Sequence, residues 1–340
     1  MNRFLTVFMV AICAVWSAGR AEAQAQWWTF EHRSYYDPLV AGVREAQVAA
    51  LLASSTRTQF ALSHKDPRVI GDVDLGVELP LFGRESSPEA GDLLKPGATG
   101  FGFWIPIDFH TIQDLNDKSA PIVNTDYRYG LMFKIRHGLS TTSWLAGRAF
   151  LGHESTHLGD EYSIRGQRRF PQSFERINVS WQYLDLGGMY ESRAGAFRSV
   201  RGGVTASVLP FRGSYYGTDA DAVTISALGP VTRSKNWCDP YIGLEMQWES
   251  VFGGGVGWDV YLSTEARWRT VYDYHKPRAD ASEDRRISVN VVTGIKKTGA
   301  GTALGRVSPF LRYYRGVNPH GQFRNQRDYT EYGVGLRFVR

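Results

Sequence analysis

The spacing H-E-x-x-H, a zinc-protease signature, occurs near the middle of the chain at His153-Glu154-Ser155-Thr156-His157. In a zinc protease, two histidines four residues apart lie on one face of a helix and bind the metal, with the glutamate beside them as general base. On a β-strand, successive side chains point to opposite faces instead. His153, Ser155 and His157 would then share one face, and Glu154 and Thr156 the other. The secondary structure of this segment therefore decides which chemistry its residues can perform.

The residues before this motif predict a strand rather than a helix. The odd positions Leu145, Ala149 and Leu151 are apolar, whereas the even position Arg148 is charged. This alternation is typical of a β-strand with one apolar face. No plausible third zinc-ligand motif follows downstream. The sequence therefore does not favour a zinc protease, and no metal ligand is assigned.

The same alternation recurs along most of the chain and predicts an all-β protein. Over 256–272 the even positions are mostly apolar, whereas the odd positions include Asp259, Glu265, Arg267 and Arg269. An apolar face toward lipid and a polar face toward a wet lumen are typical of transmembrane β-barrels. We therefore expect an antiparallel transmembrane β-barrel of about twelve strands, near residues 57–64, 71–82, 101–109, 127–135, 142–153, 177–183, 199–209, 242–248, 256–272, 287–295, 306–315 and 332–338.

Composition and charge agree with a membrane barrel. The chain is rich in aromatic residues and glycine, with 10 Trp, 17 Tyr, 18 Phe and 36 Gly. No stretch after the N-terminus reaches 18 continuous apolar residues, so no transmembrane helix is expected. The formal net charge of +5 is mild and gives no reason to expect a nucleic-acid partner. Beyond the N-terminal apolar stretch the cysteine that remains is Cys238, so no internal disulfide is expected.

The N-terminus predicts export. Arg3 precedes an apolar stretch at 4–17, and Ala21-Glu22-Ala23 matches a small-x-small cleavage site. The expected organisation is a cleaved signal peptide at 1–23, an N-terminal extension at 24–56, either periplasmic or lumenal, and an outer-membrane β-barrel at 57–340. We expect a monomer in the outer membrane of a Gram-negative-type bacterium, with outer-membrane lipids and the barrel-assembly machinery as partners.

The connections between the expected strands differ in length, which predicts the orientation of the barrel. Outer-membrane barrels have short periplasmic turns and longer outer loops. Short, glycine-rich connections at 137–141, 252–255 and 298–304 alternate with longer, polar ones at 158–175, 210–239, 273–284 and 316–328. The connection at 83–99 departs from this rule. If the chain ends in the periplasm, the His153–His157 segment lies at the outer rim.

Several stretches together carry a family resemblance. They are Tyr36-Asp37-Pro38-Leu39 followed by Arg44-Glu45, then 123–130, 153–161, Tyr313-Tyr314-Arg315-Gly316 and 319–323. In these stretches, the chain resembles bacterial outer-membrane proteins classed as domain of unknown function 1207. That family usually has a small residue where Glu154 stands. The resemblance implies an outer-membrane location and brings no established activity.

On a strand, the outward face would carry the pair His153-x-Ser155, which predicts a nucleophilic serine activated by histidine. This order also looks like that of outer-membrane phospholipases and lipid A deacylases, which are barrel enzymes with His and Ser near the outer rim. Glu175 is the candidate for the group that orients the histidine, because it begins the next strand with the same parity as Ile177. The alternative function is therefore an outer-leaflet lipid acyl hydrolase acting on phospholipid or lipid A.

Other interpretations of the same residues stay open. Polar residues are common where barrel strands leave the hydrocarbon, so His153–Glu161 also fits a structural rim. His157, Asp160 and Glu161 are further rim-site candidates. No cofactor is expected beyond a Ca²⁺ ion that the oxygens of Asp160 and Glu161 could hold, or a transition metal that His153 and His157 could hold. Lumenal charges would either line an anion-selective pore or pair with one another. The main hypothesis is a structural barrel or a small-solute pore, and whether the protein is an enzyme stays undecided.

Overall fold

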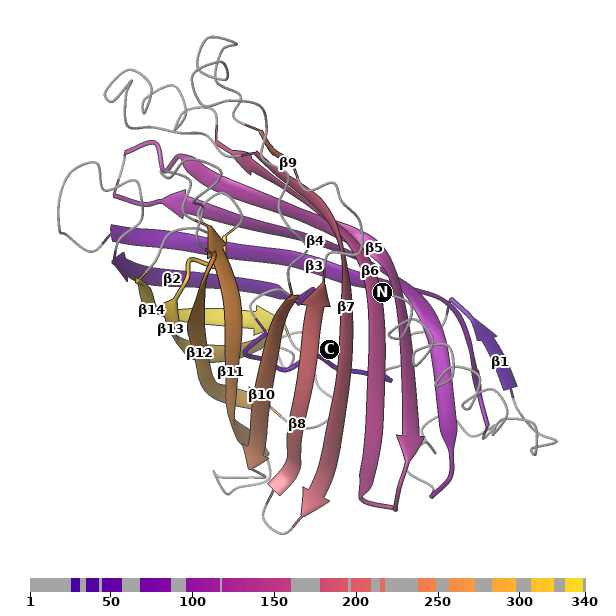
Figure 1. The fold of residues 1–340 in the computed structure, drawn as a ribbon. Helices are drawn as coiled ribbons and strands as arrows, with labels where there is room; N and C mark the ends of the chain where they lie inside the picture. Colours follow the sequence, from indigo (N-terminus) through magenta and orange to yellow (C-terminus); the bar gives the residue numbers. More distant parts are fainter. Residues whose placement is uncertain are drawn as a thin grey trace.

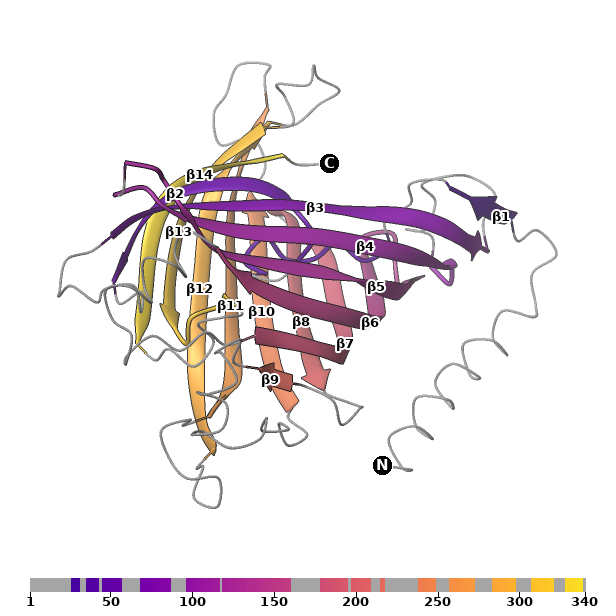
Figure 2. The same ribbon diagram turned by 90° about the horizontal axis from the view of Figure 1, so that it is seen from above.

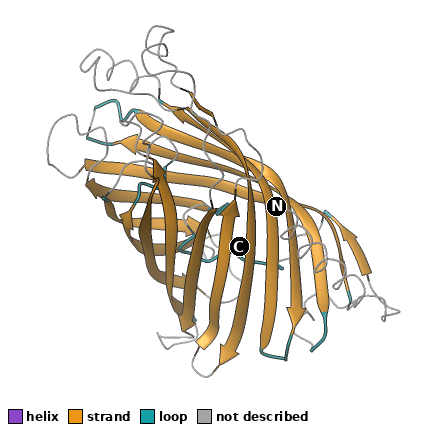
Figure 3. Cartoon of the chain, viewed as in Figure 1, coloured by secondary structure: helices purple, strands orange, loops and turns teal. Residues whose placement is uncertain are grey.

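The structure is a computed structural model, and it describes residues 26–30, 35–42, 45–56, 68–86, 96–116, 118–159, 178–194, 197–208, 215–217, 238–248, 257–272, 283–297, 307–320 and 328–338. Fourteen strands lie in these ranges. They are β1 Gln26–Thr29, β2 Val48–Thr56, β3 Arg68–Glu85, β4 Thr99–Asp114, β5 Ile122–Gly138, β6 Ser143–Leu158, β7 Asn178–Ala194, β8 Phe197–Val208, β9 Tyr215–Gly217, β10 Cys238–Trp248, β11 Trp258–Tyr272, β12 Glu283–Lys297, β13 Val307–Gly316 and β14 Tyr329–Phe338. The described residues contain no helix (Figure 3).

Twelve of these strands close into one antiparallel barrel (Figure 1). The wall runs β3-β2-β14-β13-β12-β11-β10-β8-β7-β6-β5-β4, and the pairing of β4 with β3 closes it. Closure gives each of these twelve strands a paired neighbour on both sides, and closed pairing is required of a β-structure in hydrocarbon. The short strands β1 and β9 lie outside this circle, β1 on the end of β3 (Figure 2) and β9 on the start of β7. The predicted antiparallel barrel is confirmed.

The two faces of the wall have opposite chemistry. Inward positions are often polar or charged and are buried, as at Ser263, Glu265 and Arg267 of β11. Outward positions carry large exposed apolar side chains on most strands, among them Leu52, Leu75, Leu131, Leu145, Leu151, Val204, Leu244, Ile287, Leu311, Val334 and Leu336. A soluble barrel would bury this apolar surface, whereas lipid covers it in a membrane barrel. The fold is therefore that of an outer-membrane-type β-barrel.

The barrel begins earlier in the chain than the predicted boundary at residue 57. Strand β2 covers residues 48–56 and pairs with both β14 and β3, so these residues belong to the wall rather than to an extension. Its sequence is apolar on both faces because inward Leu51 and Ala53 pack into the main hydrophobic cluster of the lumen. Such a strand shows no alternation. The strand predicted at 57–64 and the signal peptide at 1–23 lie outside the described residues.

Residues 35–42 and 45–47, called the lumenal segment below, lie inside the barrel and contact its wall on many sides. Four of its carbonyl oxygens accept hydrogen bonds from side chains of the wall. The donors are Lys134 of β5 to Tyr36, Arg201 of β8 to Asp37, Arg337 of β14 to Val40 and Asn290 of β12 to Ala41. The amides of Val40 and Ala41 donate to Glu245 of β10 and Ser263 of β11. Of the two positions considered for the N-terminal extension, the structure therefore has these residues in the lumen.

No helix within the described residues is long and apolar enough to cross a membrane.

Candidate functional site

The His153–His157 segment is the end of strand β6, as predicted. His153, Ser155 and His157 lie on the outward face, and the exposed Leu145 and Leu151 precede them on that face. Glu154 points into the lumen, where it is buried. The helical arrangement of a zinc protease is therefore absent, because the glutamate and the histidines lie on opposite sides of the wall.

Ser155 forms a hydrogen bond with the histidine that follows it, not with the one before. Ser155 Oγ lies 3.0 Å from His157 Nε2. His153 Nδ1 instead accepts a hydrogen bond from Gln182 Nε2 at 3.3 Å, because Gln182 of β7 stands directly opposite His153 in the strand register. Both histidines are two residues from Ser155 in the sequence. The hydrogen bond from Gln182 of the neighbouring strand occupies His153, and Ser155 bonds to His157. A hydroxyl hydrogen-bonded to imidazole is the core of an activated serine nucleophile.

Two tyrosines of β5 line the same outward face. The ring centroid of Tyr127 lies 5.4 Å from that of His157 in an edge-to-face arrangement, and Tyr129 lies 5.1 Å from His153. Tyrosine is enriched where barrels cross the boundary between hydrocarbon and polar headgroups. These contacts give each imidazole an aromatic neighbour on the outward face.

The predicted orienting carboxylate falls outside the part of the chain that the structure describes. Glu175, Asp160 and Glu161 all lie there, so Glu175 as the third catalytic group and a Ca²⁺ ion at the rim stay predictions. Among the described residues, no carboxylate forms an ion pair with His153 or His157. The two inward acidic residues nearest in register, Glu154 and Asp126, face the lumen.

Ion pairs and the lumenal segment occupy much of the lumen that the described residues line. Lumenal cations lie beside acidic partners in the pairs Lys134–Glu78 at 2.6 Å, Arg267–Glu265 at 3.4 Å, Arg128–Asp108 at 3.8 Å, Arg201–Glu245 and Arg148–Glu45. Glu45 accepts two hydrogen bonds of 2.5 Å from Arg148. A cavity of ≈ 20 Å³ between the lumenal segment and the wall has room for about one water molecule. The alternative of internal ion pairing therefore fits this structure better than an open pore.

Glu45 is ionised in this environment. Burial alone would raise the pKa of its carboxyl, but the guanidinium of Arg148 opposes that effect by charge and by hydrogen bonding. Arg128 and Arg267 act in the same direction, and the net pKa is lower than the ordinary value. The contact between the lumenal segment and β6 is therefore a charged pair at neutral pH.

Sequence reasoning missed a second polar cluster inside the barrel. Asp72 of β3, His110 of β4 and His320 after β13 are buried, and one possible ligand atom from each lies within 4.8 Å of the others. The even numbers of Asp72 and His110 place them on the inward faces of their strands, and this parity could have been read from the sequence. Their proximity to His320 could not, because it depends on how the barrel closes.

Comparisons with known proteins give a family and a fold but no activity. A family model described as "Protein of unknown function (DUF1207)" matches residues 26–207, more than half of the chain. No curated protein matches the sequence.

Solved structures with a similar arrangement are outer-membrane barrels. Outer membrane phospholipase A from Escherichia coli is 12% identical, with a TM-score of 0.44 and coverage of 86% of this chain and 90% of that chain. The translocator domain of the autotransporter NalP from Neisseria meningitidis is 11% identical, with a TM-score of 0.40 and coverage of 88% and 91%. The β domain of the Bordetella autotransporter BrkA is 10% identical, with a TM-score of 0.40 and coverage of 87% and 100%. Similarity of this degree carries no information about activity.

Proposed function

The chain belongs to the DUF1207 family of proteins of unknown function, and we propose that this member is an outer-membrane lipid acyl hydrolase with Ser155 as nucleophile. The observation that carries the proposal is the 3.0 Å contact between Ser155 Oγ and His157 Nε2 on the outward face of β6. The proposed substrate class is an acyl ester of a phospholipid or of lipid A.

The position of the pair supports a lipid substrate. Outward side chains of a membrane barrel meet acyl chains along the hydrocarbon band and headgroups at the rim. On β6 the apolar side chains of Leu145 and Leu151 come first, and the polar set begins at His153, near the end of the strand. A change from apolar to polar outward side chains is expected where acyl chains give way to headgroups, which supports a substrate with an ester linkage at that boundary.

The proposed reaction follows from the hydrogen bond. His157 Nε2 takes the proton of the Ser155 hydroxyl while Oγ attacks the ester carbonyl carbon, and the tetrahedral intermediate collapses to an acyl-serine. The protonated imidazole returns its proton to the departing alcohol oxygen. A water molecule, deprotonated by the same imidazole, then attacks the acyl-serine. The imidazolium returns that proton to Ser155 Oγ as the bond to the acyl group breaks and the fatty acid leaves. Glu175 stays the proposed group that orients the imidazole.

The direct test is release of fatty acid by purified protein in mixed micelles of detergent and phospholipid, with a lipid A preparation as a second substrate. We expect release by the wild type and loss of release in Ser155→Ala. Thr264→Val is the matched control, since it also removes a hydroxyl from the outward face but lies on β11, far around the wall. Equal turnover by the wild type and Ser155→Ala would rule out the proposed nucleophile.

A second candidate function, transport of a small solute through a gated lumen, is favoured by the way the lumenal segment is held. Its contacts to the wall include hydrogen bonds and ion pairs, as at Lys134, Arg148 and Asn290, which water can replace if the segment leaves. Conductance in planar bilayers tests this candidate. A gated pore predicts a closed wild type and an open barrel after deletion of 35–47, and a deletion variant that folds but does not conduct would eliminate it.

A further inference from the structure

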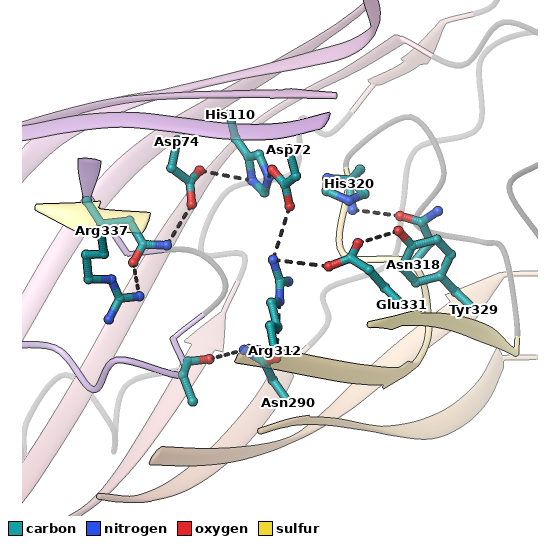
Figure 4. A network of polar contacts seen from close by, with 12 residues as sticks. Asp72, Asp74, His110, Asn290, Arg312, Asn318, His320, Tyr329, Glu331 and Arg337 are labelled. Carbon is teal, nitrogen blue, oxygen red and sulfur yellow. Dashed lines mark hydrogen bonds and ion pairs between the residues drawn. The ribbon is translucent and has the colours of Figure 1, made fainter. Parts of the chain in front are cut away.

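The structure assigns a binding site for a divalent transition-metal ion to Asp72, His110 and His320 in the lumen (Figure 4). The site is separate from the outward face of β6 and is not used by the proposed hydrolase. All three side chains are buried, and one candidate ligand atom from each lies within 4.8 Å of the others. Figure 4 shows the imidazoles of His110 and His320 on either side of the Asp72 carboxylate.

Two of the ligands are held on adjacent strands. His110 of β4 lies directly opposite Asp74 of β3 in the strand register, and Asp72 is the next inward residue of β3. His110 Nε2 is 2.5 Å from Asp72 Oδ1, and His110 Nδ1 is 3.4 Å from Asp74 Oδ1. The imidazole is therefore fixed between two carboxylates, with Nε2 toward the proposed metal.

The third ligand comes from a loop that folds into the lumen after β13. The amide of Val317 donates to Ser288 Oγ at 3.0 Å, and Arg269 donates to the carbonyl oxygen of Asn318 at 3.3 Å. The amide of His320 donates to Asn318 Oδ1 at 3.0 Å. These bonds tie the loop to β11 and β12 and bring the His320 ring to 4.7 Å from the His110 ring, between centroids.

The ligand set selects the class of metal. Two imidazoles and one carboxylate suit Zn²⁺, Cu²⁺, Ni²⁺ or Co²⁺, whereas Ca²⁺ and Mg²⁺ prefer sites made of oxygen ligands. Bonds of about 2.0–2.2 Å require the three ligand atoms to close around the ion. The ion replaces the proton shared by His110 Nε2 and Asp72 Oδ1, so binding releases that proton.

The surroundings of the three ligands match the outer shell of a metal site. A metal-ligating histidine usually donates its other ring N–H to a carboxylate, and Asp74, whose Oδ1 lies 3.4 Å from His110 Nδ1, stands in that position. Asp74 is itself held by Gln47 of the lumenal segment, whose Nε2 donates to Asp74 Oδ2 at 2.6 Å. Arg312 contacts Asp72 through Oδ2, at 3.1 Å, which leaves Oδ1 for the ion, and it also pairs with Glu331 at 3.4 Å.

The test is Zn²⁺ titration by calorimetry on the purified, chelator-treated barrel in detergent, with X-ray absorption to identify the ligands. We expect one Zn²⁺ per chain, bound by two imidazoles and a carboxylate oxygen. His320→Ala and His110→Ala should each abolish this binding. Asp74→Asn keeps the ligands and should weaken affinity by about 10–100-fold. His137→Ala is the matched control, because His137 is an exposed histidine bonded to Thr99 at the other end of β4. The His137→Ala variant should bind Zn²⁺ with the affinity of the wild type.

Folding of each variant is checked by the shift in gel migration between unheated and boiled samples. If His320→Ala does not fold, His320→Asn is titrated instead, because its amide keeps a polar side chain in the same loop. Three results would each overturn the assignment. They are unchanged Zn²⁺ affinity in a folded His320 variant, an X-ray absorption spectrum without imidazole ligands, and equal Zn²⁺ affinity of Asp74→Asn and the wild type.

Discussion

At the scale of single residues, Ser155 has a histidine two positions away on either side, and one of them forms its hydrogen bond. His157 Nε2 contacts the hydroxyl at 3.0 Å, whereas His153 is engaged by Gln182. Loss of a general base typically reduces turnover by about 10²–10⁴-fold. We therefore expect His157→Ala to reduce fatty-acid release by about that factor, and His153→Ala to reduce it by less than about tenfold.

The measurement is kcat and KM for the two variants on the same micellar substrate, with Gln182→Ala as a third variant. If His153 were the base, His153→Ala would show the larger loss in kcat. The variant Gln182→Ala removes the hydrogen-bond partner of His153. If the double variant Gln182→Ala/His157→Ala is more active than His157→Ala alone, His153 can replace His157 as the general base. A larger loss in His153→Ala than in His157→Ala would contradict the assignment of His157.

The buried carboxylate of Glu45 should make stability depend on pH. Its pKa is lowered in the folded state, chiefly because the Arg148 charge and hydrogen bonds outweigh the effect of burial. Such a group adds stability above its unfolded pKa of about 4.3, and that stability is lost as the pH falls toward the lower folded value. Unfolding free energy measured against pH should therefore fall more steeply in acid for the wild type than for Glu45→Gln. Parallel curves for the two proteins would contradict this.

At the scale of elements, the lumenal segment is joined to β6 by the pair Glu45–Arg148. Removing one member of a buried pair typically costs about 3–5 kcal/mol, because the other charge is left buried without its partner. Arg148→Met should therefore lower the unfolding free energy by about that amount. The double variant Arg148→Met/Glu45→Gln should recover part of this loss, since it leaves no unpaired charge. Urea unfolding in detergent or vesicles measures all three, and a double variant as unstable as Arg148→Met would count against the pair.

The strands show which elements can be predicted from a sequence and why others cannot. Strand β6 was predicted with the correct outward face, because Leu145, Leu151 and Arg148 obey period two over a long stretch. Strand β2 was missed, since its inward Leu51 and Ala53 pack on a neighbour that no local pattern reveals. Alternation in the sequence arises when one side of a strand faces lipid and the other faces water. A strand whose inward side packs against an apolar part of the lumen lacks this pattern, so alternation cannot predict it.

The contacts inside the barrel depend on residues far apart in the chain, and this limits prediction of the site. Glu45 and Arg148 are separated by 103 positions, and Arg312 reaches Asp72 across 240. The outward grouping of His153, Ser155 and His157 was predicted, because it is local to one strand. The choice of His157 over His153 was not, because it depends on Gln182 of the next strand.

At the scale of the whole molecule, the outward apolar surface makes embedding in a membrane testable by single substitutions. Leu244 of β10 is 44% exposed and lies opposite Thr264, in the middle part of β11, so it occupies the middle of the band. An arginine on the lipid face of a barrel typically costs about 2–4 kcal/mol at the membrane midplane and about 0–1 kcal/mol near the interfaces. We therefore expect Leu244→Arg to lower the unfolding free energy in lipid vesicles by about 2–4 kcal/mol.

Leu139→Arg is the matched control, because Leu139 has the same exposure, 45%, but lies in the turn between β5 and β6. That substitution should change the unfolding free energy by about 1 kcal/mol or less. If water rather than lipid surrounded this barrel, both leucines would face water, and both arginines would then be tolerated equally. The difference in unfolding free energy between the two variants thus tests whether Leu244 faces hydrocarbon, independently of any enzymatic activity. Equal effects in the two variants would show that the middle of β10 does not face hydrocarbon, and the lipid-facing position of Ser155 would lose its support.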